Sequence, residues 1–498
     1  SNKCPLESLS ADSFLDYFTF IKSVENPELF NELSKATDDR LTITYKDVSD
    51  AIDLCSKEGS PFLPLWIFKD FKHILLQPLI VIFQASIDLG LIPQSMKKAR
   101  IVPVPKVNNP SSLSDYRPIS STSIFLKILE RIVFNKWLVP LITEDHFFDQ
   151  FAFIPLRGRG CISALSVIYG HCVSLIDNKN YGNLLLIDLS KAFNRPSTFR
   201  IIDNLLQLGA SLQCIYWIYN FLQERQIQVY YNGHFSSITS ISGGTPQGSV
   251  ISPILFAILC HALQPVTKSC QFFKYADDLT VLHQTKHANE IDDLQTEVKN
   301  ICQWSKIYSM PINEAKTKLL HLSGKKPKQE PQISINNVKI KIVNSARLLG
   351  LHISDDLKWN IHINLAIRSA SKLFFYIVRL RRAQIRPKIL YNIYCALVRP
   401  VLSYACVATI NMPQQLVSKL LKQEKRFFKL INYSQSEKMD CFISRLLLNF
   451  TKSVKFYQFH PFRQLLIETP ILKTRSKRSI VGPYCRTSLK NNTVLKLF

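Results

Sequence analysis

The sequence lacks the patterns of a zinc knuckle, a redox motif and a disulfide framework. Its 12 cysteines form no CxxC pair and no regular Cys/His spacing, which argues against structural zinc and against paired thiols. Several of them, such as Cys55, Cys214 and Cys260, have mainly apolar neighbours. We therefore expect the cysteines to be small buried hydrophobic side chains in a reducing compartment.

Long apolar runs are also missing from the sequence. The longest, ILLQPLIVIF at 74–83 and LLLIDL at 184–189, fall short of the roughly 20 residues that span a bilayer. The first residues, SNKCPLESLS, lack the basic region and apolar core of a signal peptide. We expect a soluble intracellular protein with no membrane partner.

Acidic residues are scarce relative to basic ones. The 62 Lys and Arg outnumber the 37 Asp and Glu, which gives a formal net charge of +25. Such a protein binds nucleic acid or an anionic membrane surface, and only the second partner requires an apolar anchor. Nucleic acid is therefore the expected partner. With 498 residues, 46% of them hydrophobic, the chain should fold into two or three subdomains.

Helical and strand-like patterns alternate along the chain. Helical spacing follows an N-cap at Ser10 and recurs at 65–91 (interrupted near Pro78), 119–142, 162–176, 199–222 and 290–310. Strand patterns occur at 184–189, at 225–233, on both sides of YADD at 275–278, and between 316 and 353. Beyond 356 the pattern is helical with basic faces. The last 48 residues carry ten Lys or Arg and one acid, which is typical of a poorly ordered or RNA-dependent tail.

Three carboxylates carry the clearest chemistry. Asp188 ends the apolar strand LLLID, and Asp277 and Asp278 lie at the tip of a predicted hairpin. Clustered carboxylates repel one another, and a divalent cation is the usual way to hold them together. Oxygen ligands favour Mg²⁺ or Mn²⁺, and two such ions can support an in-line nucleotidyl transfer. Taken alone, YADD could be a solvated hairpin turn, and Asp188 could be a cap after a buried strand.

Five motifs in series resemble the reverse transcriptases of non-LTR (LINE-type, jockey-like) retrotransposons. YADD at 275–278 resembles their YxDD box, and LLLIDLSKAF resembles their first aspartate motif. GGTPQGSVISPILF resembles the PQG motif between these two. KKARIVPVPK with DYRPIS upstream, and ARLLGLHISDDLKW with VRPVLSYA downstream, resemble the non-LTR branch in particular. The resemblance runs from about 65 to about 486.

The resemblance implies roles for individual residues. Asp188, Asp277 and Asp278 would be catalytic and would bind Mg²⁺, with Mn²⁺ as the alternative ion. The nucleotide would be bound by the fingers cations Lys106 and Arg117, by the amides of Lys191 and Ala192, by Phe193 beneath the sugar, and by Gln247 and Gly248 beside the sugar and templating base. Nucleic acid would be gripped by the thumb cations Arg379, Arg381, Arg382 and Lys388. The implied partners are an RNA template, a DNA primer or target DNA, and dNTPs, in the nucleus and/or the cytoplasm as a ribonucleoprotein.

The implied fold is an α+β right hand with fingers, a palm built on an antiparallel sheet, and a helical thumb. We expect a helical lead-in at 1–85, fingers and palm at 86–353 with the palm starting near 181, a thumb at 354–450 and a basic tail at 451–498. The aromatic side chains of Phe374, Phe375 and Tyr376 are expected to pack inside the thumb.

Some features depart from the family pattern. Asn194 stands where many relatives have a second aspartate, KEGSPFLP replaces a GPDG-like turn, and QFAFIPLRGRG diverges near 150–160. Patterns of an endonuclease, an RNase H and a terminal Cys/His knuckle are missing, so we expect a partial copy of such an element. One alternative is a catalytically decayed RNA-binding remnant. Another is a maturase-like or telomerase-like polymerase, which fits VPVPK, DYRPIS and VRPVLSYA less well.

Overall fold

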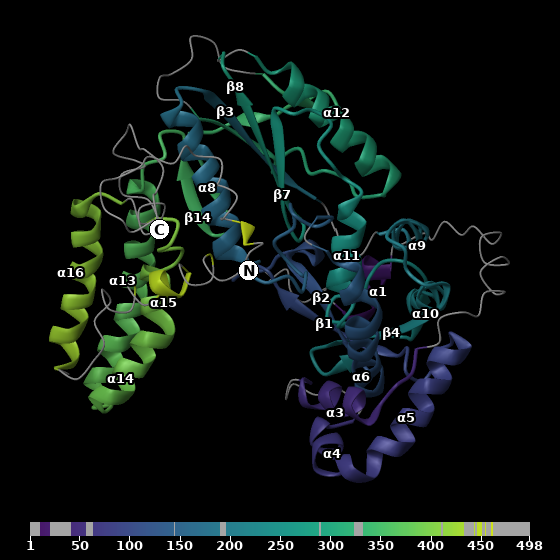
Figure 1. Ribbon diagram of the computed structural model, residues 1–498. Helices are drawn as coiled ribbons and strands as arrows, with labels where there is room; N and C mark the ends of the chain where they lie inside the picture. The colour runs from purple at the N-terminus through teal and green to yellow at the C-terminus, as the bar shows by residue number, and fades with distance from the viewer. Residues whose placement is uncertain are drawn as a thin grey trace, which may run out of the picture.

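The computed structural model describes residues 10–19, 41–55, 63–143, 145–189, 196–287, 290–322, 332–409 and 412–432, together with 443, 446–450, 454, 460 and 461. Within these residues the chain forms two main sheets, covered by helices and followed by a helical bundle (Figure 1).

The palm sheet has the strand order β12-β9-β3-β8-β7. Every pairing in it is antiparallel except that of β12 with β9. Its strands are β3 (Tyr181–Asp188), β7 (Cys270–Tyr275), β8 (Asp278–Thr285), β9 (Lys318–Leu322) and β12 (Lys341–Ile342). This sheet bears out the expectation of a palm built mainly from antiparallel strands.

Strand β3 is apolar along most of its length because both of its faces are covered. Leu184 packs into a core that includes α8 (Cys161–Asp177) and the thumb, whereas Leu185 and Ile187 pack into a second core. Consecutive residues of a strand point to opposite faces. A central strand between two cores therefore reads as a continuous hydrophobic run.

The fingers sheet has the order β2-β1-β4-β5, and β6 also pairs with β4. Its strands are β1 (Ala99–Pro105), β2 (Tyr116–Thr122), β4 (Arg225–Tyr231), β5 (His234–Phe235) and β6 (Thr239–Ile241). The strand expected at 225–233 therefore forms, but it pairs parallel to β1 in the fingers sheet and not with the palm sheet expected for 181–353. Helix α1 (Ala11–Thr19) packs on this sheet through Phe14, whose ring lies 4.9 Å from that of Tyr116.

The helices agree with the sequence patterns in part. Ser10 caps α1 as expected, since its Oγ accepts a hydrogen bond from the Ser13 amide. Pro78 lies inside α5 without breaking it, Gly209 (φ +79°) separates α9 from α10, and 119–122 are strand rather than helix. The helices around the two sheets are α3 (Tyr45–Asp53), α4 (Leu65–Asp70), α5 (Lys72–Leu89), α6 (Ile124–Val133) with a π-helical turn (Phe134–Leu138) and α7 (Val139–Leu141), α9 (Thr198–Gln207), α10 (Leu212–Leu222), α11 (Ser252–His261) and α12 (Asp292–Ile307).

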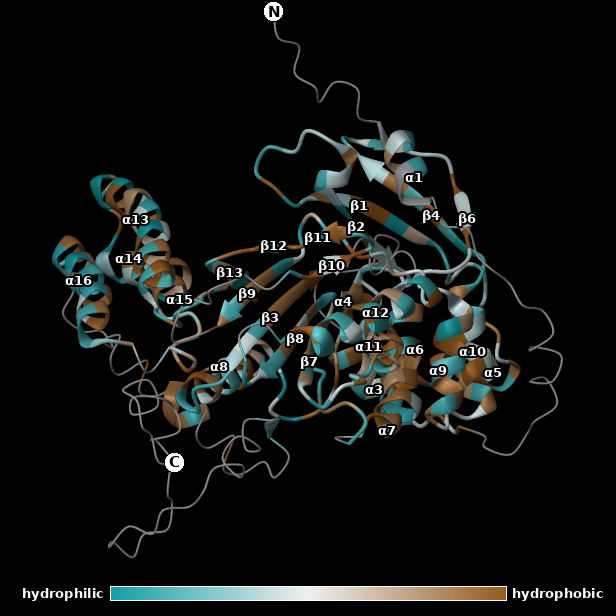
Figure 2. Cartoon of the chain, turned by 90° about the horizontal axis from the view of Figure 1, so that it is seen from above, coloured by the Kyte–Doolittle hydropathy of each residue, from teal (hydrophilic) through white to brown (hydrophobic). Residues whose placement is uncertain are grey.

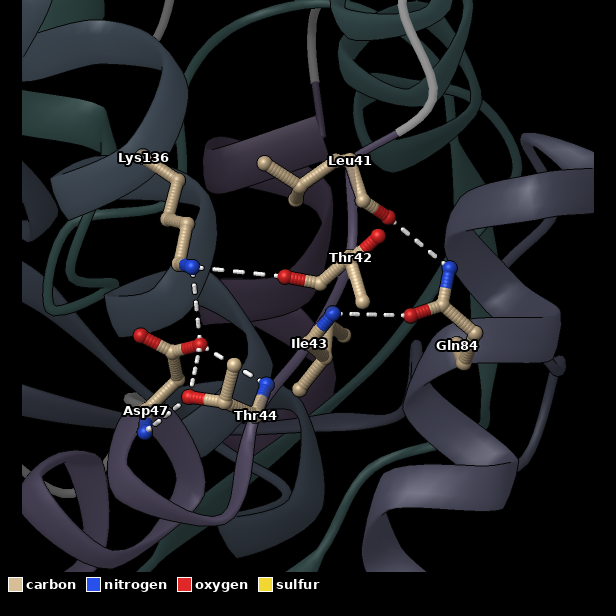
Figure 3. A network of polar contacts seen from close by, with 7 residues as sticks. All are labelled: Leu41, Thr42, Ile43, Thr44, Asp47, Gln84 and Lys136. Carbon is tan, nitrogen blue, oxygen red and sulfur yellow. Dashed lines mark hydrogen bonds and ion pairs between the residues drawn. The ribbon is translucent and has the colours of Figure 1, made fainter.

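A polar network ties the segment 41–47 to the helices beside it (Figure 3). Gln84 on α5 accepts a hydrogen bond from the Ile43 amide (2.8 Å) and donates one to the Leu41 carbonyl (2.9 Å). Lys136 forms an ion pair with Asp47 (2.8 Å), which also belongs to the capping box of α3. The segment 41–47 is thus fixed to α5 and to the π-helical turn after α6 by side-chain contacts.

The thumb is a helical bundle on the opposite side of the palm sheet from α5 and α10 (Figures 1 and 2). It contains α13 (Asn360–Arg382), α14 (Pro387–Ile393), α15 (Arg399–Leu402) and α16 (Gln414–Ile431). The stacked rings of Tyr394 and Phe427, 4.0 Å apart, lie in its core. Phe374 is buried as expected, but Phe375 and Tyr376 are exposed. Packing of all three aromatic side chains was therefore a wrong expectation, because two of them face outward from α13.

Helix α5 also differs from expectation. Among the residues that the structure describes, it is long and apolar enough to cross a membrane by length and composition, although 22% of it is buried against the protein. The expectation that every apolar segment is too short for a bilayer therefore does not hold for α5. One such helix is weak evidence for a membrane span.

Candidate active site

The register of the palm sheet places two of the three carboxylates opposite each other. Asp188 at the end of β3 is the direct partner of Asp278 at the start of β8. Tyr275 pairs with Asp278, so Ala276 and Asp277 form the tip of the β7–β8 hairpin. Ala276 has a positive φ of +55°, a conformation that is uncommon for residues other than glycine. The turn keeps Asp277 close enough to Asp188 for the charge of one to affect the other.

Burial and neighbouring carboxylates destabilise the charged forms of Asp277 and Asp278. Burial, and then the charges of Asp277 and Asp188, raises the pKa of Asp278 to about 6. Burial and Asp188 also raise the pKa of Asp277, while Arg117 opposes that rise. Asp277 and Asp278 are exposed at the residue level and Asp188 is half-buried, so solvent reaches the carboxylates. This is the environment in which a bound cation offsets repulsion.

A short segment before β9 holds the end of β3. The Asn313 amide donates to the Asp188 carbonyl (2.8 Å), and the Asp188 amide donates to Thr317 Oγ1 (3.5 Å). Lys316, which is largely exposed, lies 3.8 Å from Asp188 Oδ2. An exposed pair at this distance adds little stability. It nevertheless brings a positive charge beside the carboxylates.

The two fingers cations, Arg117 and Lys106, have different neighbours. Arg117 is exposed on β2 and acts electrostatically on Asp277, so its charge reaches the carboxylates. Lys106 directly follows β1, and its Nζ donates to the Ser114 carbonyl (2.8 Å) in the loop between β1 and β2. The structure therefore brings Arg117 toward the aspartates, while Lys106 contacts its own loop.

The PQG segment packs against β2. The Ser120 amide donates to the Gln247 carbonyl (2.7 Å). Gly248 has a φ of +118°, and a Cβ atom there would lie 2.4 Å from the Ser120 carbonyl oxygen. Glycine at 248 is thus required both by backbone conformation and by close approach. Because Ser120 follows Arg117 on β2, this contact joins the PQG segment to the strand that carries Arg117.

The remaining predicted site residues lie on the thumb or outside the described residues. Lys191, Ala192 and Phe193 fall outside the described residues. Arg379, Arg381 and Arg382 are exposed in the last turn of α13, and Lys388 is exposed on α14. The Arg379 guanidinium lies 4.7 Å from the centre of the Phe375 ring. The four cations form one basic end of the thumb, apart from the carboxylates.

Two buried charged residues beside the site were missed from the sequence. Glu130 on α6 accepts hydrogen bonds from the amides of Val250 and Ile251, and Arg225 at the start of β4 donates to the carbonyls of Gly243 and Gly244. Glu130 stands among apolar residues in FLKILERIV, and Arg225 begins a strand pattern. A charge inside an apolar pattern was the available signal for Glu130. No signal in the sequence indicated the hydrogen-bond partners of Glu130, which lie more than a hundred residues further along the chain.

The carboxylate oxygens of the site suit a hard divalent ion, although the side chains are not arranged as a metal-binding cluster. Among the described residues, His, Cys, Asp and Glu side chains form no cluster of three or more that is arranged to hold a metal. Asp188, Asp277 and Asp278 offer only oxygen atoms, and burial, followed by repulsion from the other two carboxylates, raises the pKa of Asp278. Oxygen donors that repel one another fit Mg²⁺ or Mn²⁺ better than a softer metal.

Comparisons with known proteins identify the family of the chain. The family described as reverse transcriptase (RNA-dependent DNA polymerase) matches residues 104–353. The chain is 26% identical to the RNA-directed DNA polymerase from mobile element jockey of Drosophila melanogaster, over 66% of this chain and 37% of that protein. It is 25% identical to the jockey polymerase of Drosophila funebris, over 73% of this chain and 41% of that protein. The aligned part thus spans well under half the length of these relatives.

Solved structures of telomerases are also similar. The apo telomerase from Candida tropicalis has 12% identity and a TM-score of 0.38, over 79% of this chain and 74% of that one. The family match covers half of the chain and contains Asp188, the PQG segment and YADD. The expected resemblance to the polymerases of non-LTR elements is confirmed, and the chain belongs to the reverse transcriptase family.

Proposed function

We propose that this chain is an RNA-directed DNA polymerase of a non-LTR retrotransposon, which copies an RNA template onto a DNA primer or target DNA by nucleotidyl transfer from dNTPs. The observation that carries the proposal is the register of β3 and β8, which sets Asp188 opposite Asp278 with Asp277 at the adjacent turn. Homologues with this activity in their names support it. We place the protein in the nucleus and/or the cytoplasm, as a ribonucleoprotein.

Asp188, Asp277 and Asp278 would hold the divalent ions, which we propose to be Mg²⁺ with Mn²⁺ as a substitute. Such ions, when bound, activate the attacking hydroxyl and stabilise the leaving pyrophosphate. The chain's own part is to keep the carboxylates together. The β3–β8 hydrogen bonds, together with those of Asn313 and Thr317 to the Asp188 backbone, fix the strand ends from which these side chains project.

The other side chains would bind and orient the substrates. Arg117, whose charge reaches Asp277, is placed to bind the triphosphate through its guanidinium fork, with Lys106 as a second fingers cation. Gln247 and Gly248 would contact the sugar and the templating base. Lys191, Ala192 and Phe193 keep the roles that the resemblance implies.

Primer extension on poly(rA) with an oligo(dT) primer tests the proposal. We expect dTTP incorporation that requires Mg²⁺ or Mn²⁺ and stops on addition of EDTA. A parallel binding assay with the same template and primer separates catalysis from affinity. Tight binding without extension in either metal would overturn the proposal and favour the alternative of an RNA-binding remnant.

A further inference from the structure

Residues 243–251, here called the PQG loop, connect β6 to α11 and are held at both ends by buried charged side chains. At the first end, Arg225 donates to the Gly244 carbonyl (3.0 Å) and also to the Gly243 carbonyl. At the other end, Glu130 Oε2 accepts from the Val250 amide (2.6 Å) and the Ile251 amide (3.1 Å). Gln247 and Gly248 lie between these two anchors. Neither charged residue belongs to the loop itself.

Burying the ionisable side chains of Glu130 and Arg225 costs free energy, which indicates a role for them beyond packing. The Glu130 side chain is fully buried, and the Ser249 side chain within the loop also acts on its carboxyl group. Burial raises the pKa of Glu130 to about 7, against the effect of its bonds to Ile251 and Val250. Burial likewise lowers the pKa of Arg225 to about 10. Polar groups are buried at such cost where their geometry is needed.

The clamped loop has little room to shift. Its middle meets β2 where the Ser120 amide donates to Gln247, and Gly248 packs directly on the Ser120 carbonyl. Residues 250 and 251 immediately precede α11 (Ser252–His261), so the Glu130 carboxyl group lies at the N-terminal end of that helix. Glu130 on α6 thus meets the backbone just before α11, although the two residues it binds are 120 and 121 positions further along the chain.

We propose that Glu130 and Arg225 are positioning residues for nucleotide binding, which clamp the two ends of the PQG loop so that Gln247 and Gly248 are held against β2. This inference rests on the proposed function. Neither residue is expected to touch the nucleotide, because each acts on loop backbone. Loss of either clamp should therefore weaken dNTP binding more than it slows the chemical step.

The chain offers a matched control for Glu130. Glu297 on α12 is also fully buried and accepts from two loop amides, those of Val266 (2.7 Å) and Thr267 (2.6 Å). Its loop lies before the start of β7, at the far end of that strand from YADD. Glu130→Ala and Glu297→Ala thus remove the same chemistry from two different loops.

The test measures both dTTP-dependent extension and dTTP binding to the full chain on poly(rA)/oligo(dT). For binding, the primer ends in a dideoxynucleotide and cannot be extended. For Glu130→Ala we expect KM and Kd for dTTP to rise by about ten- to a hundredfold, with a much smaller change in kcat. Glu297→Ala should leave both constants near wild type, and Glu130→Gln, which keeps an acceptor oxygen, should recover most of the binding.

Arg225→Lys supplies an independent test, since an ammonium lacks the planar guanidinium that donates from Nε to the Leu222 carbonyl and from Nη2 to the carbonyls of Gly243 and Gly244. It should raise KM for dTTP, and its effect should not multiply with that of Glu130→Ala because both act on one loop. Equal dTTP affinity in Glu130→Ala and wild type would overturn the inference. Wild-type protein that binds dTTP without extending the primer would instead overturn the proposed function alone.

Discussion

Single carboxylates carry the proposed chemistry, and each can be tested without changing its shape. Asp277→Asn or Asp188→Asn keeps the size of the side chain and removes the charge that would bind metal. We expect extension to fall on the order of a thousandfold or more, because metal stabilisation of the transition state is worth several kcal/mol. RNA binding, measured by fluorescence anisotropy, should change little.

A carboxylate outside the site provides the control for these variants. Asp53 forms an exposed ion pair with Lys72 (2.7 Å) on the N-terminal helices, so Asp53→Asn should extend primers at the wild-type rate. Comparable extension by Asp188→Asn, Asp277→Asn and Asp53→Asn would show that the site is wrongly assigned.

Glu130 also predicts a pH dependence of stability. Its pKa is about 7 in the folded protein and 4.5 by itself, so below pH 4.5 both states are protonated and it has no effect. As pH rises from 4.5 to 7 the unfolded chain loses this proton first, and the free energy of unfolding falls. Lys127 is the charged neighbour that acts on this carboxyl, and it only reduces the rise.

Glu130→Gln should remove that pH-dependent cost. Between pH 5 and pH 8, its unfolding free energy relative to wild type should improve by on the order of 2 kcal/mol, as measured by urea denaturation. A difference between variant and wild type that is the same at both pH values would contradict the raised pKa of the buried Glu130 carboxyl.

At the scale of single residues, the sequence predicted those site residues whose role can be inferred from one local motif. Asp188, Asp277 and Asp278 each stand at the end of a strand pattern, so their meeting required only the expected pairing of β3 with β8. Glu130 could not be found this way. Its role depends on amides at 250 and 251, and its own helix pattern reads as ordinary amphipathic sequence with one charge.

Strand β7 depends on a buried ion pair at its end. Lys274 Nζ lies 2.5 Å from Asp149 Oδ2, and both side chains are almost fully buried. The backbones of the same two residues are joined, since the Lys274 amide donates to the Asp149 carbonyl (2.8 Å). The pair therefore fixes the strand one residue before Tyr275 and the YADD turn.

Breaking this pair from one side should be costly. Lys274→Met leaves the Asp149 carboxylate buried without its cation, which costs about 3–5 kcal/mol of stability. The double variant Lys274→Met/Asp149→Leu should recover much of the loss, because two apolar side chains carry no unpaired charge. Urea unfolding of the two single variants and the double variant measures this. A double variant as unstable as the sum of the two would argue against direct coupling.

The sequence predicted the helices and strands better than it predicted which strands pair with each other. The strand at 225–233 formed because its pattern alternates, yet it pairs with β1, more than a hundred residues earlier. Residues 119–122 were expected in a helix but complete β2, where pairing with β1 decides the outcome over local propensity. Local patterns specify which segments are regular, whereas assignment to a sheet depends on contacts that no local window contains.

The whole molecule is strongly basic, and its exposed thumb cations lie apart from the carboxylates. The net charge of +25 draws the protein to any polyanion. Arg379, Arg381, Arg382 and Lys388 are gathered at one end of α13 and α14, and the exposed rings of Phe375 and Tyr376 lie on the same helix. A basic end with exposed aromatic rings suits a nucleic-acid backbone, so position as well as total charge should determine affinity.

Charge removal at two places separates these effects. Substituting all four thumb cations by Gln removes the same charge as substituting four exposed lysines elsewhere, Lys46, Lys268, Lys286 and Lys299. If the thumb grips the duplex, the first variant releases fewer counterions on binding, and the slope of log K against log salt should decrease by roughly 0.7–0.9 per lost phosphate contact. The lysine control should lower affinity slightly and leave the slope almost unchanged, because long-range attraction is largely screened beyond a Debye length. Titrations of poly(rA)/oligo(dT) from low to high salt give both slopes. Equal slopes in the two variants would mean that the thumb cations contribute only to overall charge, and the grip would have to be sought on another surface.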